Sequence, residues 1–171
     1  MTPRIHSFPP IAAEGCKVLI LGSMPSVTSL ERHQYYGHKQ NDFWPMMFAF
    51  FEQPYTDAYS VKQELLIKHG IALWDVLSSC EREGSLDSNI MNEIPNDING
   101  LLVQYPTIEY IIFNGGKAYQ SFKKYFPELL VQKQWIKMPS TSPAYTLKRE
   151  EKRKILSLVK DEYIDLNCSE I

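Results

Sequence analysis

Short apolar runs alternate with amphipathic segments along the chain, and this alternation predicts an order of strands and helices. Four runs rich in aliphatic or aromatic side chains have the length of buried strands: residues 17–22, 71–77, 109–114 and 134–138. The spacing of apolar residues predicts helices at 43–51, 57–69, 116–126 and 147–166. In the second helix, Ser60 and Gln63 have the spacing of a capping box, and Gly70 follows as a stop signal.

Strands that alternate with helices favour a parallel sheet covered on both faces. We therefore expect an α/β fold of three layers, α/β/α, around a central four-stranded parallel sheet. In such sheets a ligand binds beyond the carboxyl ends of the strands. Small, polar or turn-forming residues lie at all four predicted ends, at residues 22–26, Asp75, 114–117 and 139–143. These segments should meet at one edge of the sheet and form a site.

The composition limits the class of protein. The 171 residues fit one domain, with about the first 15 and the last 8 residues peripheral. No apolar run approaches the length of a membrane span, and the first residues lack the layout of a signal peptide. Cys16, Cys80 and Cys168 fit neither a disulfide framework nor a metal site, and the four histidines show no metal-site spacing. We expect a cytoplasmic monomer with no metal, cofactor or membrane contact.

The net charge of −2 argues against a protein that coats itself in nucleic acid, but the charge is unevenly distributed. From Asp161 onward there are four acidic residues and no basic one, so residues 1–160 have a net charge of +2. Residues 148–154 hold five basic and two acidic side chains, a net charge of +3. This run is either the solvated face of a helix or a surface that steers a polyanion toward the neighbouring loop.

The residues at the strand ends suit anions and planar ligands. Backbone N–H groups of residues 22–26 can hold an anion or a carbonyl, although this segment has neither a phosphate-loop ending nor a nucleophile elbow. Residues 35–45 are dense in aromatic rings, which stack on bases, and in amides, which read base edges. Hydroxyl groups at residues 140–142 suit phosphate oxygens. Ordinary turn, core or surface roles remain open for each segment at this point.

Three blocks, in this order, resemble the uracil-DNA glycosylase superfamily: residues 22–26 (GSMPS), 41–44 (NDFW) and 138–143 (MPSTSP). Residues 113–115 also resemble a strand end of its mismatch-specific branch. Within the superfamily the sequence is similar to the hypoxanthine-DNA glycosylase branch. Two features carry that similarity. Tyr-Tyr-Gly-His at residues 35–38 precedes the asparagine block, and Ala-Leu-Trp-Asp-Val at residues 72–76 is followed by Ser-Cys-Glu-Arg at residues 79–82.

The resemblance implies a repair enzyme that flips a deaminated base out of DNA and hydrolyses its N-glycosidic bond. Two departures bear on the chemistry, since Met24 stands where many members have Asp or Asn, and Met138 where the main uracil branch has His. They shift the catalytic role to Asn41, whose amide would position water or donate to the departing base. No lysine occupies an obvious nucleophile position, so we expect a monofunctional enzyme that acts on nucleoid DNA.

The resemblance also implies how the base is bound. Gly22, Ser23, Met24 and Asn114 would contact it, and Phe43 would stack on it. Asp75 falls where uracil enzymes place a base-reading Asn. As an ionised carboxylate it would accept a hydrogen bond from N1–H of hypoxanthine and repel N1 of adenine, unless it is only a loop or helix cap.

The resemblance further implies residues that contact the DNA backbone and fill the gap left by the flipped base. The implied residues are Lys117, Ser140, Thr141, Ser142, Ala144, Tyr145 and Lys148. Tyr145 lies in the loop that family members insert into DNA. It would either fill the gap left by the base or only pack against other residues of the protein.

Other functions remain open from the sequence. A uracil or G:U/T mismatch-specific DNA glycosylase is the alternative within the same class. A non-catalytic α/β module that binds nucleic acid or nucleotides is the alternative from another class. An esterase built on Ser23 or Ser26 is weaker, because neither serine lies in a nucleophile elbow.

Overall fold

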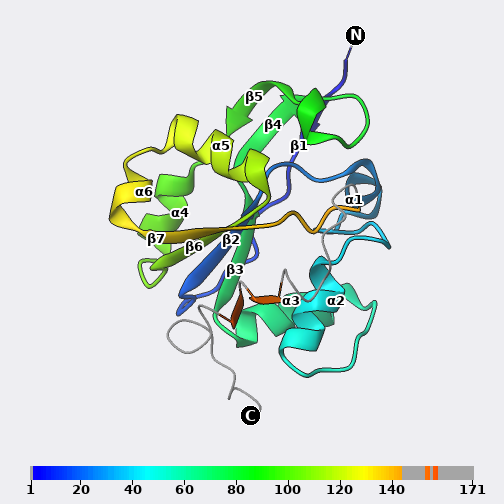
Figure 1. Cartoon of the computed structure of the whole chain (residues 1–171), viewed down its shortest axis with the longest axis vertical. Coiled ribbons are helices and arrows are strands. Elements are labelled where there is room, and N and C mark those ends of the chain that lie inside the picture. The colour runs from blue at the N-terminus through cyan, green and yellow to red at the C-terminus, as the bar shows by residue number, and fades with distance from the viewer. Residues whose placement is uncertain (1, 144–152, 155, 158–171) are drawn as a thin grey trace.

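A computed structural model describes residues 2–143, 153–154 and 156–157 of the chain. Its centre is a sheet of four parallel strands in the order β3-β2-β6-β7, which confirms the predicted fold class (Figure 1). The strands are β2 (Val18–Gly22), β3 (Ile71–Asp75), β6 (Tyr110–Asn114) and β7 (Gln134–Met138). All four runs expected from the sequence therefore form this sheet, although the second ends two residues earlier than predicted.

Alternate side chains of the central strands fill two separate cores. Val18 and Ile20 pack with α2 (Phe43–Phe50) and α3 (Tyr59–Lys68), which cover one face. Leu19 and Leu21 point the other way and pack with α4 (Ile98–Gln104) and α5 (Gly116–Tyr125), which cover the opposite face (Figure 1). Because both faces are covered, β2 is apolar along its whole length and fully buried.

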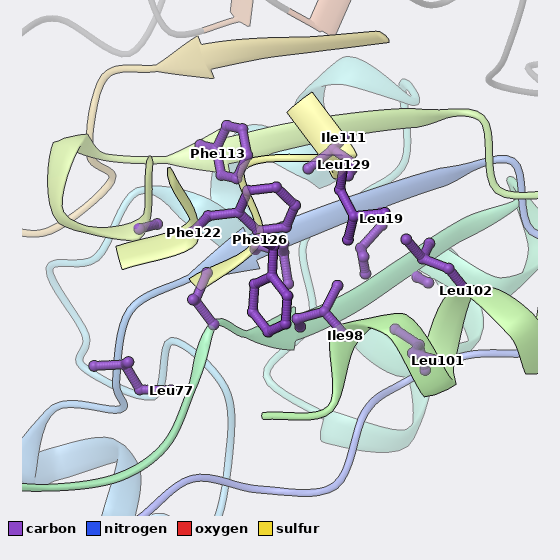
Figure 2. Close-up of a cluster of buried hydrophobic side chains, with 14 of the residues drawn as sticks. Leu19, Leu77, Ile98, Leu101, Leu102, Ile111, Phe113, Phe122, Phe126 and Leu129 are labelled. Atoms are coloured by element: carbon purple, nitrogen blue, oxygen red, sulfur yellow. The ribbon is translucent and has the colours of Figure 1, made fainter. Parts of the chain in front are cut away.

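The core under α4 and α5 is built around aromatic rings. Phe113 from β6 lies edge-on to Phe122 from α5, with ring centroids 4.9 Å apart, and Phe122 lies 5.4 Å from Phe126. Figure 2 shows these three rings gathered with Leu19 of the sheet and Ile98 of α4. This packing fixes the position of α5, and of the loop that precedes it, relative to the sheet.

A second, antiparallel sheet was not predicted. It has the order β1-β4-β5 and consists of β1 (Arg4–His6), β4 (Leu77–Glu81) and β5 (Met91–Pro95). Leu77, expected at the end of a parallel strand, instead opens β4, with only Val76 between it and the end of β3. The first residues of the chain also pack into the fold, since β1 pairs with β4 and Ile11 is buried against Leu73.

The remaining elements are short. They are α1 (Val27–Arg32), η1 (Asp87–Asn89) and α6 (Leu129–Gln132). The capping box expected at Ser60 is not formed, because α3 begins at Tyr59 and its N-cap, Ala58, has no side-chain cap. Gly70, with φ of 74°, follows the end of α3 as predicted. The helix predicted at residues 147–166 lies mostly outside the described residues.

Substituting Phe122 tests the aromatic core. Phe122→Ala removes a fully buried ring and should lower the free energy of unfolding by about 3–5 kcal/mol, through lost burial and a residual cavity. Val131→Ala is the control, because Val131 is 88% exposed and its loss should change stability by less than about 0.5 kcal/mol. Denaturant titration of both variants measures the difference, and equal midpoints would show that this cluster does not hold the fold.

Candidate active site

A cleft of about 610 Å³ lies at the carboxyl ends of the parallel strands. Gly22 of β2, Asp75 of β3 and Asn114 of β6, the last residues of three adjacent strands, line its inner end. Among the residues expected from the sequence, the cleft brings together Gly22, Ser23, Met24, Asn41, Asp75, Asn114, Lys117, Ser140, Thr141 and Ser142. The segments that follow the strands therefore converge as predicted. Ala144, Tyr145 and Lys148 lie outside the described residues.

The wall after β2 is tied to a loop that sequence reasoning missed. Residues 85–88 line the cleft opposite residues 23–26. Buried Arg82 joins the two walls, because its Nη2 donates to the Pro25 carbonyl at 2.6 Å and its Nε donates to the Gly84 carbonyl at 2.7 Å. The only signal for this wall was the Ser-Cys-Glu-Arg block that precedes it.

Ser23 crosses from one wall to the other. Its hydroxyl donates to Asp87 Oδ1 at 2.7 Å. This hydroxyl is thus engaged with a carboxylate that ties the two walls together, and Ser23 does not lie in the nucleophile elbow of an esterase. The arrangement gives Ser23 a structural role and argues against the esterase alternative.

Asn41 presents its amide to the cleft in a fixed orientation. Its Oδ1 accepts a hydrogen bond from the backbone N–H of Phe43 at 2.9 Å, at the start of α2. Its own backbone N–H donates to the His38 carbonyl at 2.9 Å. With the oxygen engaged by the backbone, the amide NH₂ is the part of the side chain that can donate to a ligand.

Tyr35 and Tyr36, rather than Phe43, are the aromatic residues that line the cleft. Phe43 is fully buried and is absent from the cleft lining, so the expectation that it stacks directly on a base is wrong for this structure. Tyr36 lines the cleft and packs over Phe43, with ring centroids 4.2 Å apart and an interplanar angle of 31°. Tyr36 has a φ of 53°, a left-handed conformation that is uncommon outside glycine and is enriched at functional sites. Phe43 supports this ring from the core.

Asp75 forms a polar floor of the cleft and has no ion-pair partner within the described part of the chain. The side chain is 3% exposed, and its Oδ2 has no hydrogen-bond partner among the residues that the structure describes. Burial, and secondarily the Asp87 carboxylate, raise the pKa of Asp75 to about 8, and the charge of Arg82 only partly offsets this. The raised pKa favours the protonated carboxyl of Asp75 at neutral pH, in contrast to the ionised carboxylate that the resemblance implied.

The hydroxyl of Tyr36 accompanies Asp75 at the floor. Tyr36 Oη is buried and lacks a hydrogen-bond partner of good geometry within the described part of the chain. Burial and the neighbouring Asp75 raise the pKa of Tyr36, so the phenol is neutral, and the nearby Asn114 amide opposes this shift. Two buried polar atoms without a hydrogen-bond partner of good geometry are unusual for a packed interior, and both belong to residues that line the cleft.

Asn114 holds the opposite wall in place. Its Nδ2 donates to Thr141 Oγ1 at 2.9 Å, and its Oδ1 accepts from the Thr141 backbone N–H at 3.0 Å. Both ends of the amide are thus used to fix the hydroxyl-rich loop against β6. Asn114 lines the cleft, and this geometry makes it a positioning residue for the loop, whereas its contact with a base stays a prediction.

Lys117 lines the cleft while paired. Its Nζ lies 2.6 Å from Glu93 Oε2. Ser140 Oγ accepts from the Ser142 backbone N–H at 3.1 Å, which folds the loop back on itself. Met138, where the uracil branch has His, is buried in the core and is absent from the cleft lining.

The described residues give no sign of a membrane span or of a metal site. They contain no helix that is both long and apolar enough to cross a membrane. They also contain no group of three or more His, Cys, Asp or Glu side chains that could hold a metal ion.

Comparisons with known proteins agree with this geometry. The family description "Uracil DNA glycosylase superfamily" matches residues 9–162. A protein of Methanosarcina acetivorans named Hypoxanthine DNA glycosylase is 44% identical over 114 residues, covering 66% of this chain and 72% of the relative. A protein of the same name from Methanosarcina barkeri is 38% identical with the same coverage.

A solved structure extends the similarity to most of the chain. It is a solution NMR structure from M. acetivorans, provisionally assigned as a uracil DNA glycosylase. The two structures superimpose with a TM-score of 0.77 and 35% identity, over 92% of this chain and 99% of the other. The chain belongs to the uracil DNA glycosylase superfamily.

Proposed function

We propose that this protein is a monofunctional DNA glycosylase that removes hypoxanthine from DNA, acting as a monomer in the cytoplasm. The names of the two Methanosarcina relatives support the substrate. The structural observation that carries the proposal is the floor of the cleft, which Asp75 and the Tyr36 ring both line. The Asp75 carboxyl is neutral there, because burial raises its pKa to about 8. A planar base with a carbonyl and a ring N–H matches such a surface.

The reaction separates charge, and this favours a neutral floor. The bond between the sugar C1′ and the base nitrogen breaks, its electron pair leaves with the base, and a water oxygen bonds to C1′. The proton that this water loses passes through solvent to the departing base, which leaves as the neutral free base. Negative charge therefore develops on the base as the bond breaks, before this proton arrives. An ionised Asp75 would repel it, whereas a protonated carboxyl can donate a hydrogen bond to the base carbonyl and stabilise it.

Asn41 has the second role. It does not titrate in the range where enzymes work, so it is not a general base. Its fixed NH₂ group can donate to the departing base or orient the attacking water. Tyr36 would stack on the base, and a base held between this ring and the walls would already be unpaired and unstacked.

Uracil is the second candidate base. It presents a carbonyl beside a ring N–H, as hypoxanthine does, and a protonated carboxyl both donates and accepts. The neutral state of Asp75 therefore does not by itself separate the two bases.

The substrate is tested on duplexes that carry one hypoxanthine, uracil, xanthine or G:T site, scored for abasic sites by alkali cleavage. We expect hypoxanthine to be removed fastest. Asn41→Ala should lower the rate by about 10²–10³, the usual cost of one preorganised donor. If no duplex is cleaved, the protein is a binding module instead. Wild-type rates for Asn41→Ala would remove this residue from the mechanism.

The protonation state of Asp75 is tested by the pH dependence of hypoxanthine removal. Because only the protonated form donates, the wild-type rate should fall about tenfold per pH unit above pH 8. Asp75→Asn keeps a donor that does not titrate, so its rate should lack this decline, and it also controls for titration of the substrate base. Asp75→Ala has no donor and should lose about 10²–10³ in rate. A wild-type rate that rises through pH 8 would contradict the donor role.

Stability provides an independent measurement of the same group. The folded state holds the proton of Asp75 up to pH about 8, whereas the unfolded chain releases it near the ordinary pKa of 3.8. The native state thus binds more protons in this window, and the free energy of unfolding should fall as pH rises, by up to about 1.4 kcal/mol per unit. Asp75→Asn should remove this slope, as urea titrations between pH 4 and 8 would show.

A further inference from the structure

A second hollow adjoins the cleft and is lined by basic side chains. It has a volume of about 290 Å³ and shares Tyr36, His38 and Asn41 with the cleft. Arg32, Lys39 and Lys62 line it, together with one carboxylate, that of Asp57. The three cations and the one carboxylate together carry a formal charge of +2. The base-binding function of the main cleft does not use this hollow.

Two of the cations converge on the two oxygens of Asp57. Lys62 Nζ lies 3.1 Å from Oδ1, and Arg32 Nη2 lies 3.4 Å from Oδ2. The second guanidinium nitrogen of Arg32 donates to the Gly37 carbonyl at 2.7 Å, which fixes the group in place. The cations are therefore arranged to bind an anion through two oxygen atoms.

The burial of this cluster is unequal. The Lys62 side chain is 3% exposed and lies near the faces of Trp44 and Tyr55, whereas the Asp57 side chain is 67% exposed. Burying an ammonium group is costly, and a purely structural pair would normally bury its carboxylate as well. Here the anion lies at the mouth of the hollow and the cation at its base. Because the Asp57 carboxylate is mostly solvated, another anion can take its place beside Lys62 without leaving the buried ammonium unpaired.

We infer that this hollow binds a phosphate group of the DNA backbone, and that Asp57 occupies the anion position when DNA is absent. The inference rests on the proposed function, because a nucleotide rotated into the cleft brings its flanking phosphates to the cleft rim. The shared wall of Tyr36, His38 and Asn41 places the hollow beside that rim. Non-bridging phosphate oxygens have the geometry that an arginine and a lysine bind together.

The test measures binding of the full chain to an undamaged DNA duplex as a function of salt. Arg32→Gln and Lys62→Met should each reduce the slope of log K against log salt by about 0.9, the loss of one phosphate contact. Asp57→Asn removes the competing anion and should tighten binding roughly two- to fivefold at low salt. Lys68→Met is the matched control, because Lys68 is an exposed lysine on the same helix and does not line the hollow.

A phosphate site predicts opposite effects on DNA binding for Asp57→Asn and Lys62→Met, whereas a purely structural ion pair does not. If Asp57→Asn weakens binding as Lys62→Met does, the three residues only hold the loop to α3, and the inference is overturned. Slopes equal to that of the wild type in Arg32→Gln and Lys62→Met would overturn it too. Arg32 is partly exposed, so its variant and Asp57→Asn decide the question even if Lys62→Met does not fold. Undamaged DNA requires no excision, so these results are independent of the base-removal assay.

Discussion

The site depends on the close approach of Asp75 and Tyr36 to the backbone of Gly22. The parallel register pairs Gly22 with Asp75 across β2 and β3. A Cβ atom at Gly22 would lie 2.7 Å from Asp75 Oδ1 and 2.9 Å from Tyr36 Oη, so neither group could keep its position. A residue without a side chain at the end of the central strand therefore lets an aromatic hydroxyl and a carboxyl meet at the floor, and the three walls are arranged around them.

Each wall is held by polar contacts that leave ligand-facing groups in fixed positions. Arg82 joins two loops through their carbonyls, and the Asn114 amide holds the third against the sheet. Such preorganisation means that donors need not reorient when charge develops on a leaving group. It has a thermodynamic cost, because the unpartnered oxygens at the floor would be better satisfied in water. Stability and chemistry are therefore opposed at Asp75.

The sequence predicted the central sheet well, because strands buried on both faces appear as continuous apolar runs. β4 and β5 escaped this criterion, since residues such as Ser78, Glu81 and Asn92 make them polar and partly exposed. Most of the site was predictable because strand ends converge in any parallel sheet. Phe43 and Tyr36 could not be ranked from sequence, because the choice depends on which ring faces the core. The charge state of Asp75 depends on burial, which a sequence does not display.

The connection between the two sheets has a consequence for motion. Only Val76 separates β3 from β4, and its backbone N–H donates to the Gly22 carbonyl at 2.8 Å, while Asn96 donates to the Asp75 carbonyl at 2.8 Å. The floor is thus anchored to both sheets, and displacing it would require the sheets to shear past each other. We therefore expect local opening to occur in the loops, and the backbone amides at the floor of the cleft to exchange with solvent mainly through global unfolding. Any adjustment of the cleft to its ligand is therefore expected in the loops, whereas the floor keeps its position.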